Sequence, residues 1–195
     1  MNKKNLTIGL ATLVLSIANA PNAQAALING VTVTTNMGAL LGTNINNIVN
    51  GVGLPGDIPS LTETHAVGSP SNAWIGTLST NNLITFNLNG SYNLGGFSLW
   101  NFNPTTTFGV RGVNILTSID GTNFTTLAGA PTQFADGADN APESPEQFSF
   151  APVTASFVRF QVLTNTGNSR PQAGLLEVQF DSASATVSST AVPEP

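Results

Sequence analysis

The feature that most restricts the fold is a set of short segments in which apolar and polar residues alternate. In the segment 157–163, Val158, Phe160 and Val162 fall on one face of a strand, and the residues between them fall on the other. Similar segments are rich in β-branched and aromatic residues, end at Gly, Asn or Pro, and show no helical period. The sequence therefore predicts strands at 31–35, 83–88, 97–102, 110–118, 124–127, 147–150, 157–163 and 175–180.

About eight short strands separated by turns are typical of a single antiparallel β-sandwich or jelly roll. Asp120-Gly121 lies between two predicted strands and predicts a hairpin, because both residue types tolerate a positive φ. Asn89-Gly90 and Gly95-Gly96 predict turns on either side of Tyr92. A chain of 195 residues can bury one sizeable core. We therefore expect an all-β protein with one folded domain, at 26–181.

The first 25 residues have the organisation of a secretory signal peptide. Lys3 and Lys4 precede an apolar run from Leu6 to Ala18, and the small-x-small sequence at 23–25 follows it. The apolar run is shorter than the roughly 18 residues that a membrane-spanning helix needs. We expect cleavage after Ala25 and secretion.

The charge balance excludes several classes of partner. The chain has five Lys and Arg against ten Asp and Glu, and cleavage would leave three Arg against the same ten carboxylates. No basic stripe is available for a phosphate backbone, so we expect no nucleic-acid partner and no anionic membrane surface. The absence of Cys excludes disulfides, thiol nucleophiles and cysteine-bound metals.

Catalytic motifs are missing from the sequence. His65 is the only histidine, and neither Gly-x-Ser-x-Gly nor His-Glu-x-x-His occurs. We expect His65, close to Glu63, to be solvated in a loop. A Gly/Pro-rich segment holds four acidic residues that we expect to form a hydrated turn: Asp136, Asp139, Glu143 and Glu146. We therefore predict that the protein is not an enzyme.

Three runs in the middle of the chain resemble the discoidin, or coagulation factor 5/8 C-type, domain. The run Ile84-Thr-Phe-Asn-Leu88 is similar to the family's F-D-L-G strand, and Leu99-Trp-Asn101 to its I-W-N strand. Ser118-Ile-Asp-Gly-Thr-Asn-Phe124 is similar to its S-x-D-G-x-x-F/W hairpin. The resemblance covers about 47–180 and implies a galactose-binding-like jelly roll. It departs from the pattern at Asn50, where the family has Asp, and at 52–70, which interrupts the early motif.

The final residues carry a second resemblance. The segment 182–195 is a Ser/Thr-rich linker, and its end, Val192-Pro-Glu-Pro195, resembles the opening of the PEP-CTERM sorting signal of exopolysaccharide-producing Gram-negative bacteria. The resemblance implies recognition by an exosortase-type enzyme and a place in the cell envelope, extracellular matrix or biofilm. The apolar helix and basic cluster of that family do not follow within this sequence, so a truncated signal and a non-functional one both stay open.

The discoidin resemblance implies one structural calcium ion. The family's ligands correspond to Asn50, Ser71 and Glu177, and Asp57 could add a carboxylate. These are oxygen donors of the types that calcium accepts. In the alternative, Glu177 caps the loop by accepting backbone N–H bonds without any metal.

The resemblance also implies ligand binding by exposed loops at one end of the sandwich. Candidate ligand contacts are the aromatics Tyr92, Trp100 and Phe108 and the polar residues Asn101, Asn103 and Arg111. In the alternative reading, Trp74 and Trp100 fill the core, and Arg111 and Arg159 form structural ion pairs.

We expect a secreted, non-catalytic module that binds an extracellular polysaccharide or cell-surface glycan. The alternative is a structural or adhesive matrix protein that contacts other proteins and has no sugar site. The long segment 36–70 is a candidate lid or specificity loop.

Overall fold

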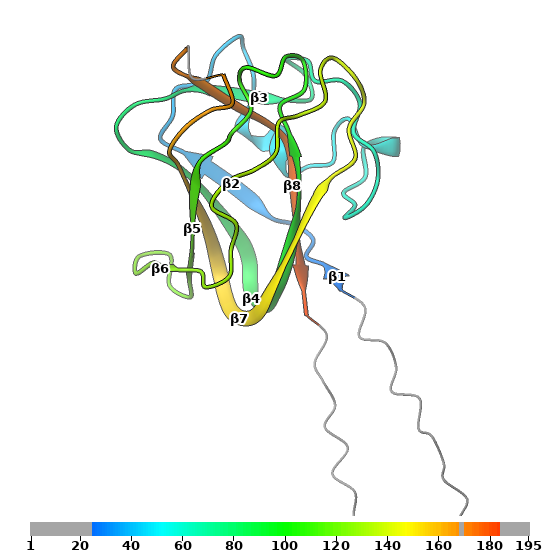
Figure 1. Ribbon diagram of the computed structural model, residues 1–195. Coiled ribbons are helices and arrows are strands. Elements are labelled where there is room, and N and C mark those ends of the chain that lie inside the picture. Colours follow the sequence, from blue (N-terminus) through cyan, green and yellow to red (C-terminus); the bar gives the residue numbers. More distant parts are fainter. Residues whose placement is uncertain (1–24, 168–169, 184–195) are drawn as a thin grey trace, which may run out of the picture.

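A computed structural model describes residues 25–167 and 170–183 (Figure 1). The signal-peptide prediction, except Ala25, and the PEP-CTERM-like end lie outside the described residues. Two short 3-10 helices, η1 (Ile45–Ile48) and η2 (Pro55–Asp57), precede most of the strands. The strands are β1 (Ala26–Leu27), β2 (Thr32–Thr35), β3 (Trp74–Thr77), β4 (Asn82–Asn101), β5 (Val113–Ser118), β6 (Thr125–Thr126), β7 (Glu146–Val162) and β8 (Gln172–Ser182).

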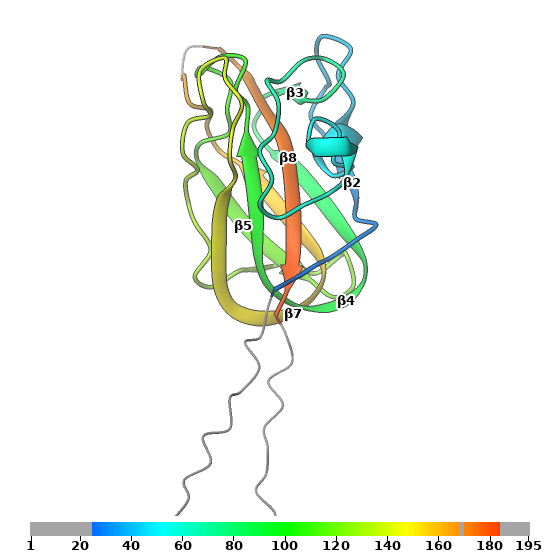
Figure 2. The same cartoon turned by 90° about the vertical axis from the view of Figure 1, so that its right-hand side faces the viewer.

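Two long strands, β4 and β7, organise the whole fold. They pair antiparallel along most of their length and bend together where the register shifts between Asn87 and Tyr92. The first half of β4 also pairs with β2 and its second half with β8, whereas the C-terminal half of β7 pairs with β5. The bend, visible at the bottom of Figures 1 and 2, folds the pair into the two layers of an antiparallel β-sandwich. The predicted fold class is confirmed.

The strand predictions differ from the structure where the chain bends. The segments 83–88 and 97–102 belong to the one strand β4, and 147–150 and 157–163 belong to β7. Asn89-Gly90 forms an irregularity inside β4 instead of a separate turn, with Asn89 at φ 56°. The Asp120-Gly121 hairpin is confirmed, because β5 and β6 pair on either side of it. Strands β1 and β3 were not predicted.

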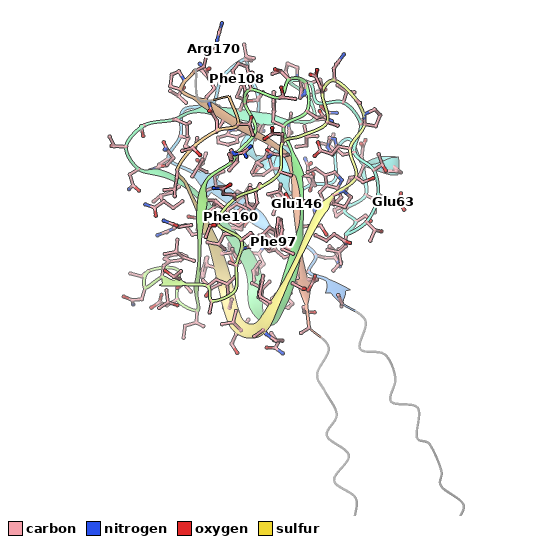
Figure 3. The ribbon with its side chains drawn as sticks, viewed as in Figure 1. Glu63, Phe97, Phe108, Glu146, Phe160 and Arg170 are labelled. Carbon is pink, nitrogen blue, oxygen red and sulfur yellow. The ribbon has the colours of Figure 1, made fainter. Side chains whose placement is uncertain are left out.

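Aromatic side chains from both layers fill the main core. Phe86 on β4 lies 5.1 Å from Phe160 on β7 and 5.0 Å from Phe180 on β8, measured between ring centroids. Phe97 packs against Phe160 at 5.5 Å, inside the sandwich (Figure 3). Trp74 is fully buried in this core, as expected. The predicted alternation along β7 is also confirmed, since the side chains that face the core are the buried ones.

A second apolar cluster lies beside the main core. It contains Ile75 on β3, Trp100 on β4 and Leu176 on β8. The residue that precedes each of them in the chain, Trp74, Leu99 and Leu175, belongs to the main core. Because successive side chains of a strand point to opposite faces, this sheet is buried on both faces. Leu54, from the segment 36–70, is buried in this cluster, and Leu40 of the same segment packs against it. That segment therefore covers the outer face of the sheet.

The two ends of the described chain lie at one pole of the sandwich. Ala26 of β1 pairs with Ser182 at the end of β8. The loops around 104–112 and 164–167 lie at the opposite pole, at the top of Figure 1. No helix among the described residues has the length and apolar character to cross a membrane.

Candidate functional site

Trp100 does not lie in an exposed loop. Its side chain is 0% exposed, and its indole N–H donates to the carbonyl oxygen of Glu63 at 3.0 Å. The prediction that Trp100 contacts a ligand is wrong, because the segment 36–70 covers the face of β4 on which it lies.

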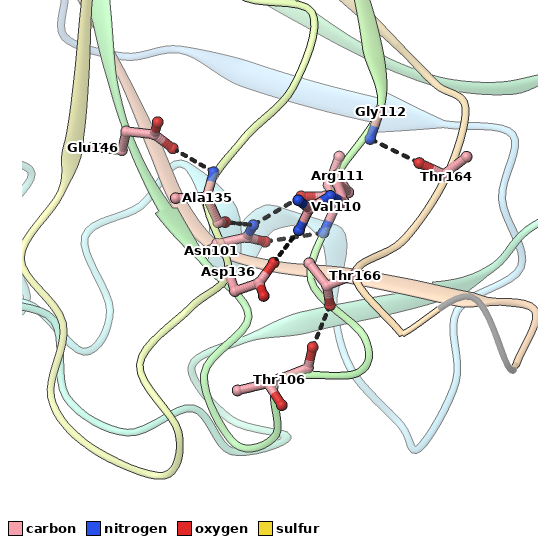
Figure 4. Close-up of polar contacts among 10 residues, drawn as sticks. All are labelled: Asn101, Thr106, Val110, Arg111, Gly112, Ala135, Asp136, Glu146, Thr164 and Thr166. Atoms are coloured by element: carbon pink, nitrogen blue, oxygen red, sulfur yellow. Dashed lines mark hydrogen bonds and ion pairs between the residues drawn. The ribbon is translucent and has the colours of Figure 1, made fainter.

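Asn101 and Asn103 are also buried, and their side-chain groups are used inside the protein. The amide of Asn101 donates to the carbonyl oxygens of Val110 and Ala135 at 2.8 and 2.7 Å (Figure 4). Asn103 accepts from the backbone N–H of Gly68 at 2.8 Å. Both residues hold loops together, so the prediction that they lie in exposed loops is wrong.

Tyr92 and Arg111 lie at different ends of the sandwich. Tyr92 sits opposite Ala155 near the bend of β4, is half-buried and packs against the main core. Arg111 lies beyond the far end of β4 and forms an ion pair with Asp136 at 2.6 Å. The six residues predicted for ligand contact are therefore not brought together as one set, and the ion-pair alternative for Arg111 is confirmed.

The acidic segment forms the wall of a cavity instead of a hydrated turn. We call this cavity of about 370 Å³ the acidic hollow; Asp136, Glu143 and Glu146 line it together with Asn101. Burial raises the pKa of Glu143 to about 7. Glu146 accepts from the backbone N–H of Ala135 at 2.9 Å. The expectation of a freely hydrated turn is therefore wrong for Glu143.

His65 is buried, which corrects the expectation of a solvated histidine. Its ring nitrogens Nδ1 and Nε2 lie 2.7 Å from the carbonyl oxygen of Ala66 and 3.0 Å from that of Val52. Burial lowers the pKa of His65. The backbone of His65 pairs with that of Glu143 through two hydrogen bonds. His65 therefore fastens the segment 52–66 to the loop that precedes β7.

Glu177, the central residue of the predicted calcium site, is fully buried on β8. Both of its carboxyl oxygens lie 3.2 Å from the backbone nitrogen of Gly51, and the amide of Gln179 donates to one of them. Burial raises the pKa of Glu177 to about 8. A buried carboxyl without a basic partner fits a bound cation, and the hydrogen bond from Gly51 equally fits the loop-capping alternative.

The other predicted calcium ligands lie around the same loop. The side-chain oxygens of Asn50 and Asp57 each accept from a backbone N–H of that loop at 3.0 Å. The Ser71 hydroxyl lies 2.9 Å from that of Ser69. No three His, Cys, Asp or Glu side chains in the described part of the chain are placed to hold a metal ion. Of the predicted ligands, only Glu177 is a fully buried carboxyl without a basic partner among the described residues.

The loop pole holds a different cavity, of about 270 Å³, which we call the apical hollow. Phe108, Arg170 and Gln172 are the aromatic, cationic and amide-bearing residues of its lining. Phe108 and Arg170 lie close together at the top of Figure 3. The Gln172 side-chain oxygen is buried and has no hydrogen-bond partner. Apolar side chains form the rest of the lining: Leu40, Leu41 and Ile75.

Backbone and side-chain hydrogen bonds among the loops and β8 fix the position of these residues. The carbonyl oxygen of Phe108 accepts from the N–H of Gly174 at 2.7 Å. The Thr166 hydroxyl donates to the carbonyl oxygen of Thr106 (Figure 4). The buried Asn165 amide donates to the carbonyl oxygens of Arg170 and Gln172, each at 2.6 Å. The apical hollow is thus built on a braced pair of loops.

Sequence reasoning singled out Phe108 but missed Arg170 and Gln172. The two residues lie at the start of β8 and just before it, in a segment without any motif. They reach Phe108 only because the loops at 104–110 and 164–167 are hydrogen-bonded to each other.

The folded body is thus an antiparallel β-sandwich with braced loops and hollows at one pole. A family model of the F5/8 type C domain matches residues 57–174. The chain belongs to the F5/8 type C domain family. No match is found among curated proteins.

Solved structures with the same fold share little sequence with this chain. CBM32-1 from a family 31 glycoside hydrolase of Clostridium perfringens aligns with a TM-score of 0.56 at 13% identity, covering 80% of this chain and 96% of that one. The family 32 CBM of C. perfringens NanJ, in complex with galactose, aligns with a TM-score of 0.55 at 10% identity, covering 80% and 97%.

A larger enzyme also contains the fold. CpGH89 from C. perfringens, in complex with its substrate GlcNAc-α-1,4-galactose, aligns with a TM-score of 0.53 at 20% identity. The match covers 87% of this chain but only 16% of that enzyme. The similarity therefore concerns one module of the enzyme.

Proposed function

We propose that this domain is a carbohydrate-binding module and that it binds sugar in the apical hollow. The observation that carries the proposal is that an aromatic residue, Phe108, an arginine, Arg170, and an amide residue, Gln172, line one cavity. An aromatic face packs on the apolar C–H surface of a sugar ring, and a few polar groups then fix its orientation. The similar fold of the NanJ module in complex with galactose supports the proposal.

The test is binding of the mature chain, residues 26–195, to a panel of neutral and acidic oligosaccharides by isothermal titration calorimetry. We expect saturable binding that Phe108→Ala weakens at least about tenfold. Arg111→Gln is the matched control, because Arg111 pairs with Asp136 at the acidic hollow. Loss of binding in Arg111→Gln but not in Phe108→Ala would indicate that the sugar binds in the acidic hollow instead.

The proposal extends to where the protein acts. The signal-peptide and PEP-CTERM-like sequences support export to the cell envelope or extracellular matrix, with exopolysaccharide or a cell-surface glycan as the ligand and an exosortase-type enzyme as the processing partner. Fractionation of the producing cells, with N-terminal sequencing of the protein, tests it. An N-terminus at Ala26 in the extracellular fraction is expected, and an uncleaved cytoplasmic protein would contradict it.

A structural calcium ion is part of the same proposal. Glu177 would supply the carboxylate, with oxygens of Asn50, Asp57 and Ser71 around it, and the ion would neutralise a buried negative charge. We expect calcium to raise the midpoint of thermal unfolding relative to a chelator in the wild type and not in Glu177→Gln. Equal midpoints in calcium and chelator for the wild type would favour the loop-capping alternative.

One observation favours the alternative role as an adhesive matrix protein. Leu41 is 77% exposed and borders both the apical hollow and a smaller apolar cavity of about 130 Å³. Apolar surface of this kind can receive a side chain of a protein neighbour. If Leu41→Ser abolished retention of the protein by a matrix stripped of polysaccharide, the adhesive role would be preferred.

A further inference from the structure

The described part of the chain contains three arginines, and two of them have structural partners. Arg111 pairs with Asp136 at 2.6 Å. The Arg159 guanidinium lies 3.6 Å above the centre of the Phe124 ring, and its Nε donates to a threonine hydroxyl at 3.0 Å. Arg170 is exposed and forms no salt bridge with any described residue. It is therefore the arginine whose charge is left for a ligand.

The lining of the apical hollow contains no carboxylate. The acidic hollow, in contrast, presents Asp136, Glu143 and Glu146, and its neighbouring cation, Arg111, is already paired. A ligand with a negative charge would be repelled from the acidic hollow and attracted to the apical one. The two cavities therefore differ in the sign of charge that they accept.

We propose, building on the carbohydrate-binding function above, that the apical hollow selects a sugar unit that carries a carboxylate, a uronic acid. The guanidinium of Arg170 donates to the sugar carboxylate, in the planar two-point geometry that arginine favours. Phe108 packs on the C–H face of the ring, and the Gln172 side chain in the lining forms a hydrogen bond with a hydroxyl. Leu40 and Leu41 form the apolar part of the lining beside this contact.

The charge of the whole chain restricts which acidic glycan is recognised. Ten carboxylates against three arginines in the mature protein repel a densely charged polymer over about 10 Å at moderate salt. The contact at Arg170 acts at a few ångströms and is local. The ligand is therefore a glycan whose acidic units are separated by neutral sugars, instead of a continuous polyuronate.

The test compares disaccharides that contain one uronic acid and one neutral sugar with the same disaccharides after carboxyl reduction. Glucuronic, galacturonic and mannuronic acid each supply one pair, and the two members of a pair differ in the carboxylate. We expect the mature chain to bind the acidic member of at least one pair about tenfold more tightly or better. Arg170→Gln should abolish this preference, Arg170→Lys should retain part of it, and Arg111→Gln should leave it unchanged. Arg170 is exposed, so the variants should keep the wild-type melting temperature.

The outcomes separate this inference from the broader function. Equal binding of acidic and reduced members would overturn the selection for a carboxylate and leave carbohydrate binding in place. A preference that survives Arg170→Gln would overturn the role of Arg170. Tighter binding of a continuous polyuronate than of the spaced disaccharides would overturn the restriction by overall charge. Binding of neither member in any pair would overturn the inference, and the neutral panel with Phe108→Ala then decides the proposed function.

Discussion

Gly53 makes room for the buried His65. Gly53 has φ 99°, and a Cβ at this position would lie 2.4 Å from the Cε1 atom of the His65 ring. The imidazole occupies the space that a side chain would need, and its two nitrogens meet carbonyl oxygens of the covering segment. A glycine and a histidine twelve positions apart thus form one structural unit.

Gly53→Ala should destabilise the protein more than a glycine replacement that meets only backbone strain. Gly30 is the matched control, because it has φ 74° and a methyl group added there would have no atom within 4 Å. We expect Gly30→Ala to cost about 1 kcal/mol of unfolding free energy and Gly53→Ala at least about twice as much. Urea denaturation measures both, and equal costs would contradict the packing of His65 against Gly53.

The pKa of Glu143 predicts how stability depends on pH. Burial raises this pKa to about 7 in the folded protein, above the value of about 4.3 that glutamate has in unfolded chains. The protonated form is therefore favoured by folding, and its contribution is full below about pH 4.3 and lost as the pH rises through about 7. The wild type should lose more unfolding free energy than Glu143→Gln between these values. Denaturation at several pH values checks this, and parallel curves for the two proteins would contradict it.

At the scale of elements, the segment 36–70 acts as a cover for a sheet that would otherwise expose apolar side chains. Trp100, Ile75 and Leu176 face it, and Leu54 packs among them. The Ser98 hydroxyl donates to the carbonyl oxygen of Leu61 at 2.7 Å, which fixes the cover to β4. A role in stability follows directly from this packing, whereas the sequence had suggested a lid or specificity loop.

Leu54→Ala should therefore destabilise the fold. The side chain is 3% exposed, and its loss leaves a cavity beside Trp100 at a cost of about 2–5 kcal/mol. Ile119→Ala is the control, since Ile119 is 68% exposed and its replacement should change stability by less than about 0.5 kcal/mol. Thermal and urea unfolding compare the two variants. A cost for Leu54→Ala no larger than that for Ile119→Ala would show that the cover is not part of the cooperative fold.

At the scale of the molecule, the proposed sugar site and the chain ends lie at opposite poles. β1 pairs with the end of β8, and the loops that carry Phe108 and Arg170 lie at the other end of the sandwich (Figures 1 and 3). A domain attached through its C-terminal segment would therefore present the apical hollow outward. This arrangement suits a module that is fixed to a surface and captures a glycan beyond it.

Immobilisation tests this polarity. A chain coupled to a biosensor through its C-terminus should bind the oligosaccharide with the affinity measured in solution, because the coupling point is remote from the apical hollow. A chain coupled through a cysteine introduced at exposed Leu41, at the rim of that hollow, should lose binding. Equal binding by the chains coupled in these two ways would show that the sugar site does not lie in the apical hollow.

Most of the strand segments, the hairpin at Asp120-Gly121 and the family were predictable from the sequence because each depends on neighbouring residues. Alternation along 157–163 assigns the buried face of β7, and the order of motifs identifies the F5/8 type C domain. These features are local or colinear with the chain, so the sequence contains the information that determines them.

The candidate site was decided by tertiary structure. Trp100 looks like a ligand-stacking residue until the segment 36–70 covers it, and His65 looks solvated until Gly53 admits it. Arg170 and Gln172 join Phe108 only through hydrogen bonds between distant loops. The burial of a side chain, and its meeting with others at a cavity, depend on contacts between residues far apart in the chain. The alternation within a strand does not indicate what covers its outer face.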